Sequence, residues 1–445
     1  MLARTPEALG IALEAAVIRR ITLLAAVALA ALANAAPAQI LYGTWGSGPN
    51  DVWIVGSNMI TIHWDGQQLT QVRFGAPTDS INIDHALYAV WGAGPNDVFA
   101  VGEYGAAKRW NGTAWTALPA VPINWYSVEL RGVTGRSASD VWAIGHQPMQ
   151  GGRDVLLHFD GRAWTAHPFP FEVSLYSIAV TPTEVLVAGH AHRAGTPRTA
   201  PRAGLLGHWA GERWRFQGYD GSTVNDHTIG DLPLYAVKVH GSTVVVAGQR
   251  LDSQWTVLRS EAGGPWTDLG APAIPQRPIS YQGNGVMPGG RAFASASLTM
   301  AGDGALVAAF PGGYARFVNG QWTMVTAETV PPPPAGVTRL VQIAAFHYAD
   351  GPAIWAPSGD DFWIAGQSSK ITHVTGAQVQ FVSFFECLTP SFSSWTRDDP
   401  ACRALRQGPV TVVGGAAVVP QAAPTTKPAP QAAPAPAKPP EARAR

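Results

Sequence analysis

The residues best suited to binding a polar ligand are gathered in a few long stretches between hydrophobic segments. One stretch holds the pair Trp125-Tyr126, a second is basic from His190 to Arg202, and a third is acidic from Tyr219 to Asp231. Aromatic rings beside carboxylates and guanidinium groups suit sugar or peptide binding, because stacking and hydrogen bonds act together there. An alternative for the aromatic pair is that it only covers the ends of neighbouring strands. The predicted ligand-binding residues are Trp125, Tyr126, His190, His192, Arg193, Arg198, Arg202, Tyr219, Asp220, Asp226 and His227.

The same stretches offer less for catalysis or for metal binding. Glycoside hydrolysis needs two carboxyl groups facing one pocket, and Asp220, Asp226 and Asp231 are only loop residues with suitable chemistry. His190 and His192 resemble half of a metal site, but no further ligand can be assigned. The chain has no G-x-S-x-G, P-loop or H-E-x-x-H motif. We therefore predict no catalytic residue, no metal and no cofactor, and we keep a hydrolase or lyase as an alternative.

Charge and composition limit the partners and favour one fold class. Lys plus Arg and Asp plus Glu each number 30, so a formal charge of zero does not favour nucleic acid or an anionic membrane. Only 13% of the 445 residues are charged, whereas glycine (48), proline (37) and tryptophan (17) are abundant. Many turn residues and aromatics with few helix formers indicate an all-β protein.

One sequence pattern recurs along the chain and must position these stretches. The segment 45–56 (WGSGPNDVWIVG) returns at 91–102 (WGAGPNDVFAVG), more loosely at 134–145 (TGRSASDVWAIG), and again at 355–366 (WAPSGDDFWIAG). With degenerate copies between them, we count seven repeats. Self-similarity at a period of about 45 to 60 residues means that each copy is one supersecondary unit stacked on its neighbours.

The second repeat shows what the unit is. Four short hydrophobic stretches, separated by turn signals, are expected as strands: 87–91, 97–101, 106–110 and 114–118. The last two are joined by Asn111-Gly112, a tight hairpin turn. Four antiparallel strands in about 45 residues make a blade of a β-propeller. We therefore predict a single propeller of about seven four-stranded blades; six or eight remain alternatives, since 410–419 could add a strand.

Three sets of recurrent residues are interpreted as structural. Asp51, Asp97 and Asp140 follow the first turn of a repeat, where Asx side chains cap turns. Tryptophans of the fourth strand are expected to fill the gap between adjacent blades. A basic or imidazole residue of the third strand is expected to bond a neighbouring blade. The tryptophans are Trp115, Trp164, Trp214, Trp266 and Trp322, and the third-strand residues are His63, Arg109, His158, His208, Arg259, Arg316 and His373.

The long insertions are expected on one face of the propeller. In an up-and-down blade, the turns between strands one and two and between strands three and four share a face, and these stay short here. The insertions 147–153, 190–206, 217–233, 271–290 and 326–334 fall in the other set of connections. Loops held by a rigid scaffold often carry function, and insertions in repeats often map to a binding face.

Both ends of the chain are expected to lie outside the propeller. Arg19-Arg20, an apolar run and small residues predict a signal peptide over 1–38, cleaved after Ala35 or Ala38. The propeller is predicted over 39–386. Cys387 and Cys402 are expected to form a disulfide in an extension over 387–420, with two free thiols as the alternative. The Ala/Pro/Lys-rich stretch 421–445 is predicted to be a disordered tail.

The repeat resembles a bacterial family. The phrase W-G-x-G-P-N-D-V-x-x-V-G, followed by His or Arg, an aromatic, Asp or Asn, and Gly, is similar to that of secreted β-propeller repeat proteins of the YVTN/BNR/WD40-like class. The resemblance covers about residues 40–385 and implies the propeller fold. Sialidase Asp-boxes differ from Asp160-Gly161-Arg-Ala-Trp164, where aspartate and glycine are adjacent. This departure argues against a glycosidase.

The resulting hypothesis is an exported, non-enzymatic binding scaffold in the periplasm or outside the cell. It would engage a glycan, a peptide or an envelope protein through the face with the long insertions. We expect no nucleic-acid partner, no membrane span after signal cleavage, and a monomeric propeller. A glycan-active hydrolase or lyase is one alternative; the other is an envelope assembly component that interacts through its tail.

Overall fold

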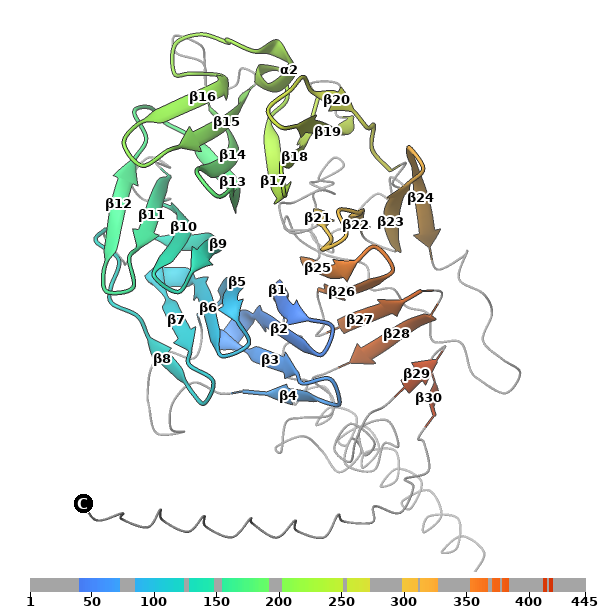
Figure 1. Ribbon diagram of the computed structural model, residues 1–445. Helices are drawn as coiled ribbons and strands as arrows, with labels where there is room; N and C mark the ends of the chain where they lie inside the picture. Colours follow the sequence, from blue (N-terminus) through green and yellow to red (C-terminus); the bar gives the residue numbers. More distant parts are fainter. Residues whose placement is uncertain are drawn as a thin grey trace, which may run out of the picture.

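The computed structural model is a ring of seven β-sheets around a common axis (Figure 1). It describes residues 40–72, 85–123, 128–147, 154–191, 202–250, 254–272, 298–310, 313–326, 353–366, 370–376, 378–383, 411–413 and 416–418. Within these residues, the helical segments are the short α2 (His227–Gly230) and two 3₁₀ turns, η1 (Ser57–Met59) and η2 (Glu103–Gly105). The prediction of an all-β, seven-bladed propeller is confirmed.

Each blade is built from four strands that follow one another in the chain. Blades 1 to 4 contain β1 (Leu41–Gly48), β2 (Asp51–Gly56), β3 (Thr61–Trp64), β4 (Leu69–Gln71); β5 (Leu87–Gly94), β6 (Asp97–Gly102), β7 (Ala107–Trp110), β8 (Trp115–Ala117); β9 (Glu129–Ser137), β10 (Asp140–His146), β11 (Val155–Phe159), β12 (Trp164–Pro168); β13 (Ser174–Val180), β14 (Val185–Ala191), β15 (Ala203–Trp209) and β16 (Trp214–Gly218). Blades 5 to 7 contain β17 (Leu234–His240), β18 (Thr243–Gln249), β19 (Trp255–Glu261), β20 (Thr267–Asp268); β21 (Leu298–Met300), β22 (Leu306–Phe310), β23 (Gly313–Val318), β24 (Gln321–Thr326); β25 (Ala353–Ser358), β26 (Asp361–Ala365), β27 (Lys370–Thr375) and β28 (Gln378–Ser383).

The segment at 410–419 extends the last blade and does not make an eighth. Its two strands, β29 (Thr411–Val413) and β30 (Ala416–Val418), pair in series beyond β28, so that this sheet has six strands. In the second repeat, β5 continues to Gly94, three residues beyond the predicted end of that strand. The first turn is therefore tighter than the sequence indicates.

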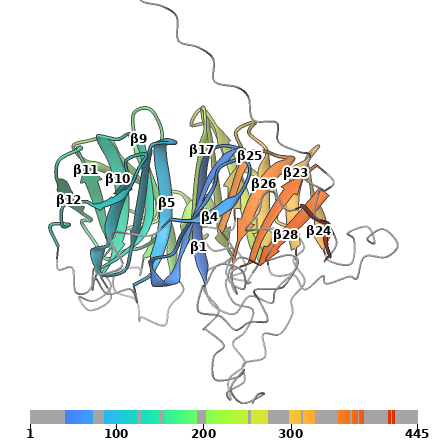
Figure 2. The same cartoon turned by 90° about the horizontal axis from the view of Figure 1, so that it is seen from below.

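Strand direction separates two faces of the ring (Figure 2). All pairs within a blade are antiparallel, so the first-to-second and third-to-fourth turns share one face, called the short-turn face here. The second-to-third and blade-to-blade connections leave from the opposite face, called the elaborated face. The strands that flank the long insertions end on the elaborated face, as the sequence predicts.

The recurrent acidic residue pairs with the third strand of its own blade. His63 Nε2 lies 2.6 Å from Asp51 Oδ1, and Arg109 donates from Nε to Asp97 Oδ1 over 2.6 Å. The same pair recurs as His158 with Asp140 (3.0 Å), His208 with Glu184 (3.0 Å) and His373 with Asp361 (2.8 Å).

The expected bond from the third strand to a neighbouring blade is therefore wrong for these five pairs. In blades 5 and 6, which lack the acidic residue at this place, the basic residue has a different partner. Arg259 binds Glu261 on its own strand, and Arg316 binds Asp360 of blade 7. Opposite the basic residue, the second strand often carries an aromatic ring. The His63 ring stacks on Trp53 with ring centroids 4.2 Å apart, and Arg109 lies 5.4 Å from the Phe99 ring centre.

Four of the fourth-strand tryptophans lie in the spaces between blades. Trp115 and Trp164 are each 5% exposed; Trp115 packs edge-on against Trp53 of the preceding blade at 5.3 Å. Trp214 and Trp322 donate their indole N–H to Pro168 O and Leu269 O of the preceding blade, over 3.3 and 3.1 Å. These rings thus join neighbouring sheets through hydrophobic clusters that two blades share.

Packing between blades explains why tryptophan is followed by glycine at the start of the repeat. The Trp45 ring covers Gly92 of the next blade, where an added Cβ would lie 2.4 Å from a ring carbon. The Trp91 ring covers Gly135 in the same way, and the Trp355 ring of blade 7 covers Gly46 of blade 1. Each tryptophan thus needs a glycine at the following position one blade further on.

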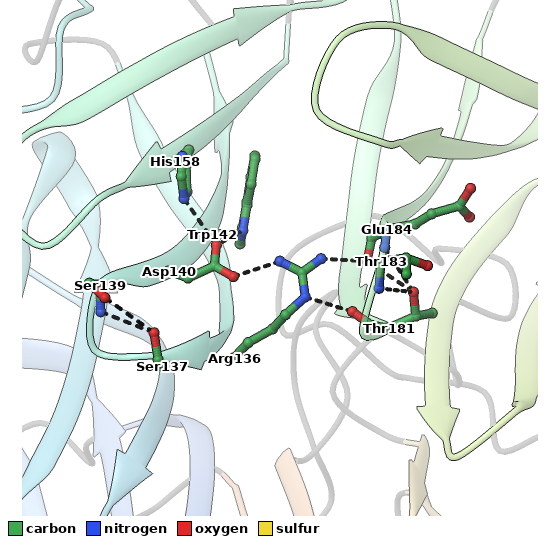
Figure 3. A network of polar contacts seen from close by, with 9 residues as sticks. All are labelled: Arg136, Ser137, Ser139, Asp140, Trp142, His158, Thr181, Thr183 and Glu184. Carbon is green, nitrogen blue, oxygen red and sulfur yellow. Dashed lines mark hydrogen bonds and ion pairs between the residues drawn. The ribbon is translucent and has the colours of Figure 1, made fainter.

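Among the strands that the structure describes, none is exchanged between sheets, so the ring closes through packing between blades 7 and 1. Leu41 N donates to Gly366 O over 3.1 Å, and both blades contribute to one hydrophobic cluster. On the short-turn face, Arg136 joins blades 3 and 4 (Figure 3). Its guanidinium donates to Asp140 (2.6 Å) and to the carbonyl oxygens of Thr181 (2.6 Å) and Glu184 (3.0 Å).

Candidate binding face

The innermost strands of five consecutive blades begin with the same irregularity on the elaborated face. In each, the register with the second strand shifts by one residue, and one residue is left unpaired in a β-bulge. The unpaired residues are Tyr42, Tyr88, Arg131, Tyr176 and Tyr235. We call the four tyrosines the tyrosine rim. These innermost strands lie next to one another around the axis (Figure 1), so the bulged residues follow one another along five of the seven blades at this face.

A leucine precedes each bulged residue and anchors it. The leucines are at most 2% exposed, whereas the bulged residues are half-buried or exposed; the leucines are Leu41, Leu87, Leu130, Leu175 and Leu234. A bulge bends its strand and re-aims a side chain. The leucine thus enters the core between two blades, while the next side chain stays half-buried or exposed.

Rim residues of blades 1 and 2 form an aromatic pair, and one of the two tyrosines is hydrogen-bonded to Glu103. The rings of Tyr42 and Tyr88 meet edge-on at 5.1 Å. Tyr88 donates its hydroxyl to Glu103 Oε1 over 2.8 Å, and Glu103 Oε2 accepts the Ala86 N–H over 2.9 Å. Burial and the neighbouring Glu103 carboxylate raise the pKa of Tyr88, so the hydroxyl stays protonated and acts as a donor. The pair is held in one geometry before any ligand arrives.

A second aromatic cluster spans blades 4 and 5. The Tyr176 ring lies 4.9 Å from Tyr235 and 5.2 Å from His190, and Tyr235 lies 5.3 Å from Trp255. His190 is 1% exposed, and its Nε2 contacts the guanidinium of the exposed Arg202. The structure therefore brings together two residues predicted from the sequence, His190 and Arg202, and adds three aromatic rings to them.

Charged side chains of blade 3 lie between these two aromatic clusters. Arg131 donates to Glu129 over 2.6 Å. Asp154, whose side chain is 2% exposed, lies 2.6 Å from His146 Nδ1 and accepts the Leu175 N–H of blade 4 over 2.5 Å. Burial raises the pKa of Asp154, although His146 and the Leu175 N–H oppose that effect. This carboxyl group thus links blades 3 and 4 directly beneath the bulge of Tyr176.

Tyr104 is the most exposed aromatic residue of the described part of this face. It is 47% exposed and has φ 53°, in the left-handed region that non-glycine residues seldom adopt. Its ring lies 4.5 Å from that of His85, and the next residue, Gly105, donates its N–H to Val128 O of blade 3. An exposed ring on a fixed, strained backbone is the kind of feature that clusters at functional sites.

The acidic stretch after β16 is a compact cap on blade 4 at the same face. Tyr219 is 2% exposed and packs against Phe171, so its ring belongs to the core. Asp220 accepts the N–H groups of Ser222 and Thr223, and these bonds lower its pKa to about 2. Asp226 caps α2 by accepting the Thr228 N–H over 2.8 Å. These groups hold the local backbone.

His227 and Asp231 complete this cap. They are exposed and lie 3.0 Å apart, across α2, which packs on β15 and β16. Of the predicted site, His227 and Arg202 are thus exposed and His190 lies under the rim. Trp125, Tyr126, His192, Arg193 and Arg198 lie outside the described residues, as do Cys387 and Cys402.

The rim itself was missed by the sequence analysis, although a signal for it exists. Leu-Tyr recurs in blades 1, 2, 4 and 5, with its tyrosine eight or nine residues before the start of the second strand, and Leu130-Arg131 stands at the same place in blade 3. Among the described residues, no group of three or more His, Cys, Asp or Glu side chains could hold a metal ion. In the same part of the chain, no helix is long and apolar enough to span a membrane.

Comparison with known proteins identifies solved structures of similar fold but assigns the chain to no family. No protein-family description and no curated protein sequence matches the chain. Similar solved structures include YCF48 bound to D1 peptide (12% identity, TM-score 0.47, covering 76% of this chain and 94% of that one). Others are the WD40 propeller domain of Doa1 (10%, 0.46, 79% and 95%) and the SapL1 lectin with alpha methyl fucoside (16%, 0.38, 65% and 96%). These likenesses concern the propeller architecture alone.

Proposed function

We propose that this protein is an exported, non-enzymatic scaffold that binds a peptide segment of an envelope protein against the tyrosine rim. The observation that carries the proposal is the bulge repeated in five consecutive blades, which puts four tyrosines and Arg131 at equivalent places on the elaborated face. The fold uses the buried leucine of each Leu-Tyr pair, but it does not require a ring at the next, half-exposed position. Tyrosine is enriched at binding surfaces because it combines apolar area with a hydroxyl.

The arrangement of the rings favours a peptide over a glycan. Sugars stack on a flat, open ring face, whereas the rim rings meet one another at steep angles: 75° between Tyr42 and Tyr88 and 50° between Tyr176 and Tyr235. Such packing leaves ring edges at the surface, and the exposed Arg131 and Arg202 each carry several N–H donors. Peptide carbonyl and carboxylate groups accept hydrogen bonds from these donors.

Export rests on the sequence of the N-terminal 38 residues, and an envelope partner follows from that location. The test therefore uses the chain from Gln39 onward. A displayed peptide library and an array of envelope glycans with peptidoglycan fragments would be screened in parallel. We expect enrichment of a peptide motif containing carbonyl-rich or acidic positions.

A matched pair of variants would assign the binding to the rim. Tyr176→Ala/Tyr235→Ala should weaken the selected peptide by about 30-fold, because aromatic residues at the centre of an interface contribute about 2 kcal/mol or more. Gln67→Ala/Thr113→Ala, in exposed turns of the short-turn face, should leave the affinity unchanged. Thermal unfolding of both variants would check that the ring is intact.

Other outcomes would replace the proposal. Capture of a glycan alone, with equal affinity in both variants, would contradict peptide binding at the rim. A cleaved product in the supernatant, detected by mass spectrometry, would favour the hydrolase alternative. Loss of capture on deleting 421–445, with full capture by the rim variant, would assign the interaction to the C-terminal stretch.

A further inference from the structure

Blades 5 and 6 have neither the aromatic ring opposite the third-strand basic residue nor the acidic residue that blades 1, 2, 3 and 7 share on the short-turn face. In blade 1, Trp53 stands opposite His63, and in blade 2, Phe99 stands opposite Arg109. The cross-strand partner of Arg259 is Val245, which carries no ring, and Thr243 occupies the place of the acidic residue. Blade 6 has Val307 opposite Arg316 and Ala305 in place of the acid.

A cavity of about 230 Å³ lies where the ring of blade 5 is missing. Its wall includes Val245 and Arg259 of blade 5 and Met300, Leu306 and Phe317 of blade 6. The residues at its opening include Gly304 and Asn319, which belong to turns of the short-turn face. The cavity is therefore reached from the face opposite the tyrosine rim.

Equivalent positions in other blades show what fits there. Trp53 packs between blades 1 and 2 against Trp110 and Trp115, at 5.1 and 5.3 Å. The residues of blade 6 at these two positions are Phe317 and Trp322, whose rings also contact each other, at 5.3 Å. Phe317 therefore lines the cavity without the ring contact that Trp53 gives to Trp110, because Val245 stands in place of Trp53.

The polar side of the cavity fits the same occupant. Arg109 binds Asp97 and at the same time lies 5.4 Å from the Phe99 ring centre. Arg259 also has an acid, since its Nε donates to Glu261 Oε1 over 2.5 Å, but the ring opposite it is absent. Guanidinium groups are attracted to aromatic faces, so a ring placed in the cavity would complete the arrangement seen in blade 2.

We propose that this cavity binds a planar aromatic ring system of indole size, supplied either by a small molecule or by an aromatic side chain. An apolar cavity of about 150 Å³ holds benzene, and the larger volume here accommodates a second ring. The ring would lie between Phe317 and the guanidinium of Arg259, with Val245 and Leu306 beneath it.

The test uses 5-fluoroindole as the small molecule and N-acetyl-tryptophanamide as the side chain. Fluorine NMR of 5-fluoroindole in a titration with the whole chain should show saturable binding, and N-acetyl-tryptophanamide should displace it if a side chain also fits. Displacement identifies a side chain as a permitted source; its failure restricts the ligand to small molecules. No saturable binding at millimolar indole would overturn the proposal.

Three variants locate the site. Val245→Phe fills the cavity from within and should abolish binding without lowering the unfolding temperature; Met300→Phe does the same from the opposite wall if the first variant does not fold. Arg259→Gln should weaken binding about threefold by removing the cation beside the ring. Tyr176→Ala on the other face should bind 5-fluoroindole normally, which separates this site from the tyrosine rim. Unchanged binding by both filled variants would contradict the assignment.

Discussion

The acidic side chain that begins the second strand of a blade holds several groups at once. Asp140 accepts from Arg136 and from the indole N–H of Trp142 (2.6 Å each) and lies 3.0 Å from His158 Nε2 (Figure 3). The Trp142 and His158 rings stack at 4.0 Å. Because Arg136 continues to the carbonyls of blade 4, this one carboxylate organises both its blade and the next interface.

Asp140→Asn is expected to lower the free energy of unfolding by about 1 to 3 kcal/mol at neutral pH, since hydrogen bonds to charged groups contribute in this range. Burial alone would raise the pKa of Asp140, but Arg136, Trp142 and His158 outweigh it and lower the pKa below 3.8. A carboxyl group with a lowered pKa stabilises the fold above its unfolded pKa and loses that contribution as pH falls through its folded pKa.

Urea unfolding between pH 7 and pH 2 checks this prediction. The wild type should lose more stability than Asp140→Asn as the pH falls below about 4, because the unfolded chain binds a proton at this carboxyl group more readily than the folded protein does. Glu212→Gln, in an exposed turn of blade 4, should follow the wild type. Identical acid limbs for the wild type and Asp140→Asn would show that Asp140 has no such role.

Tyr104 offers a way to separate binding from folding. Asparagine tolerates the left-handed region better than most residues, so Tyr104→Asn should leave the unfolding temperature unchanged or raise it slightly. The same change removes an exposed ring from the elaborated face and should weaken the selected peptide several-fold. Isothermal titration and thermal unfolding of one preparation measure both effects; a destabilised variant with full affinity would mean that the ring only serves the fold.

Contacts between blades depend on rings and glycines of successive repeats. Gly92→Ala should destabilise the protein by about 1 to 3 kcal/mol, because its Cβ would lie 2.4 Å from the Trp45 ring and overpacking costs this much. Gly94→Ala, two residues away, meets nothing within 4 Å and should be neutral. Denaturant unfolding of the two variants side by side is the measurement, and equal midpoints would refute the Trp-Gly packing.

Much of the element order could be predicted, because it depends on features that repeat in the sequence. Strands, turns, the blade count and the inter-blade role of Trp115 and Trp164 follow from hydrophobic patterns and periodicity. The partner of His63 was predicted wrongly, although Asp51 precedes it by 12 residues, as Asp97 precedes Arg109 and Asp361 precedes His373. In blades 3 and 4, insertions after the second strand make the spacing between the acidic and the basic residue longer than 12 residues.

The tyrosine rim could not be predicted by the same means. A bulge is a property of register between two strands, and Leu87-Tyr88 reads as ordinary strand in the sequence. Likewise, Asp220 and Asp226 have the composition of a binding loop, whereas their carboxylates satisfy backbone N–H groups of a turn and of α2. The positions of the insertions identify the elaborated face. Their composition does not distinguish a side chain that holds the loop from one that is free to contact a ligand.

For the molecule as a whole, the two faces have different roles. On one face, Asp-to-His or Asp-to-Arg pairs join strands within a blade and Arg136 joins blades 3 and 4; the bulged tyrosines lie on the other face. Ring closure without strand exchange leaves the innermost strands in fixed order around the axis. A ligand that spans the tyrosine rim would therefore contact several blades at once, and its affinity would depend on an intact ring.

The most direct test of this division is photo-crosslinking to the peptide selected by the chain. Benzophenone-phenylalanine would replace Tyr104 on the elaborated face or Ala262 in a turn of the short-turn face; both positions are exposed and have a left-handed φ (53° and 50°). The account predicts crosslinks from position 104 and none from position 262. Crosslinks from position 262 alone would contradict binding at the tyrosine rim.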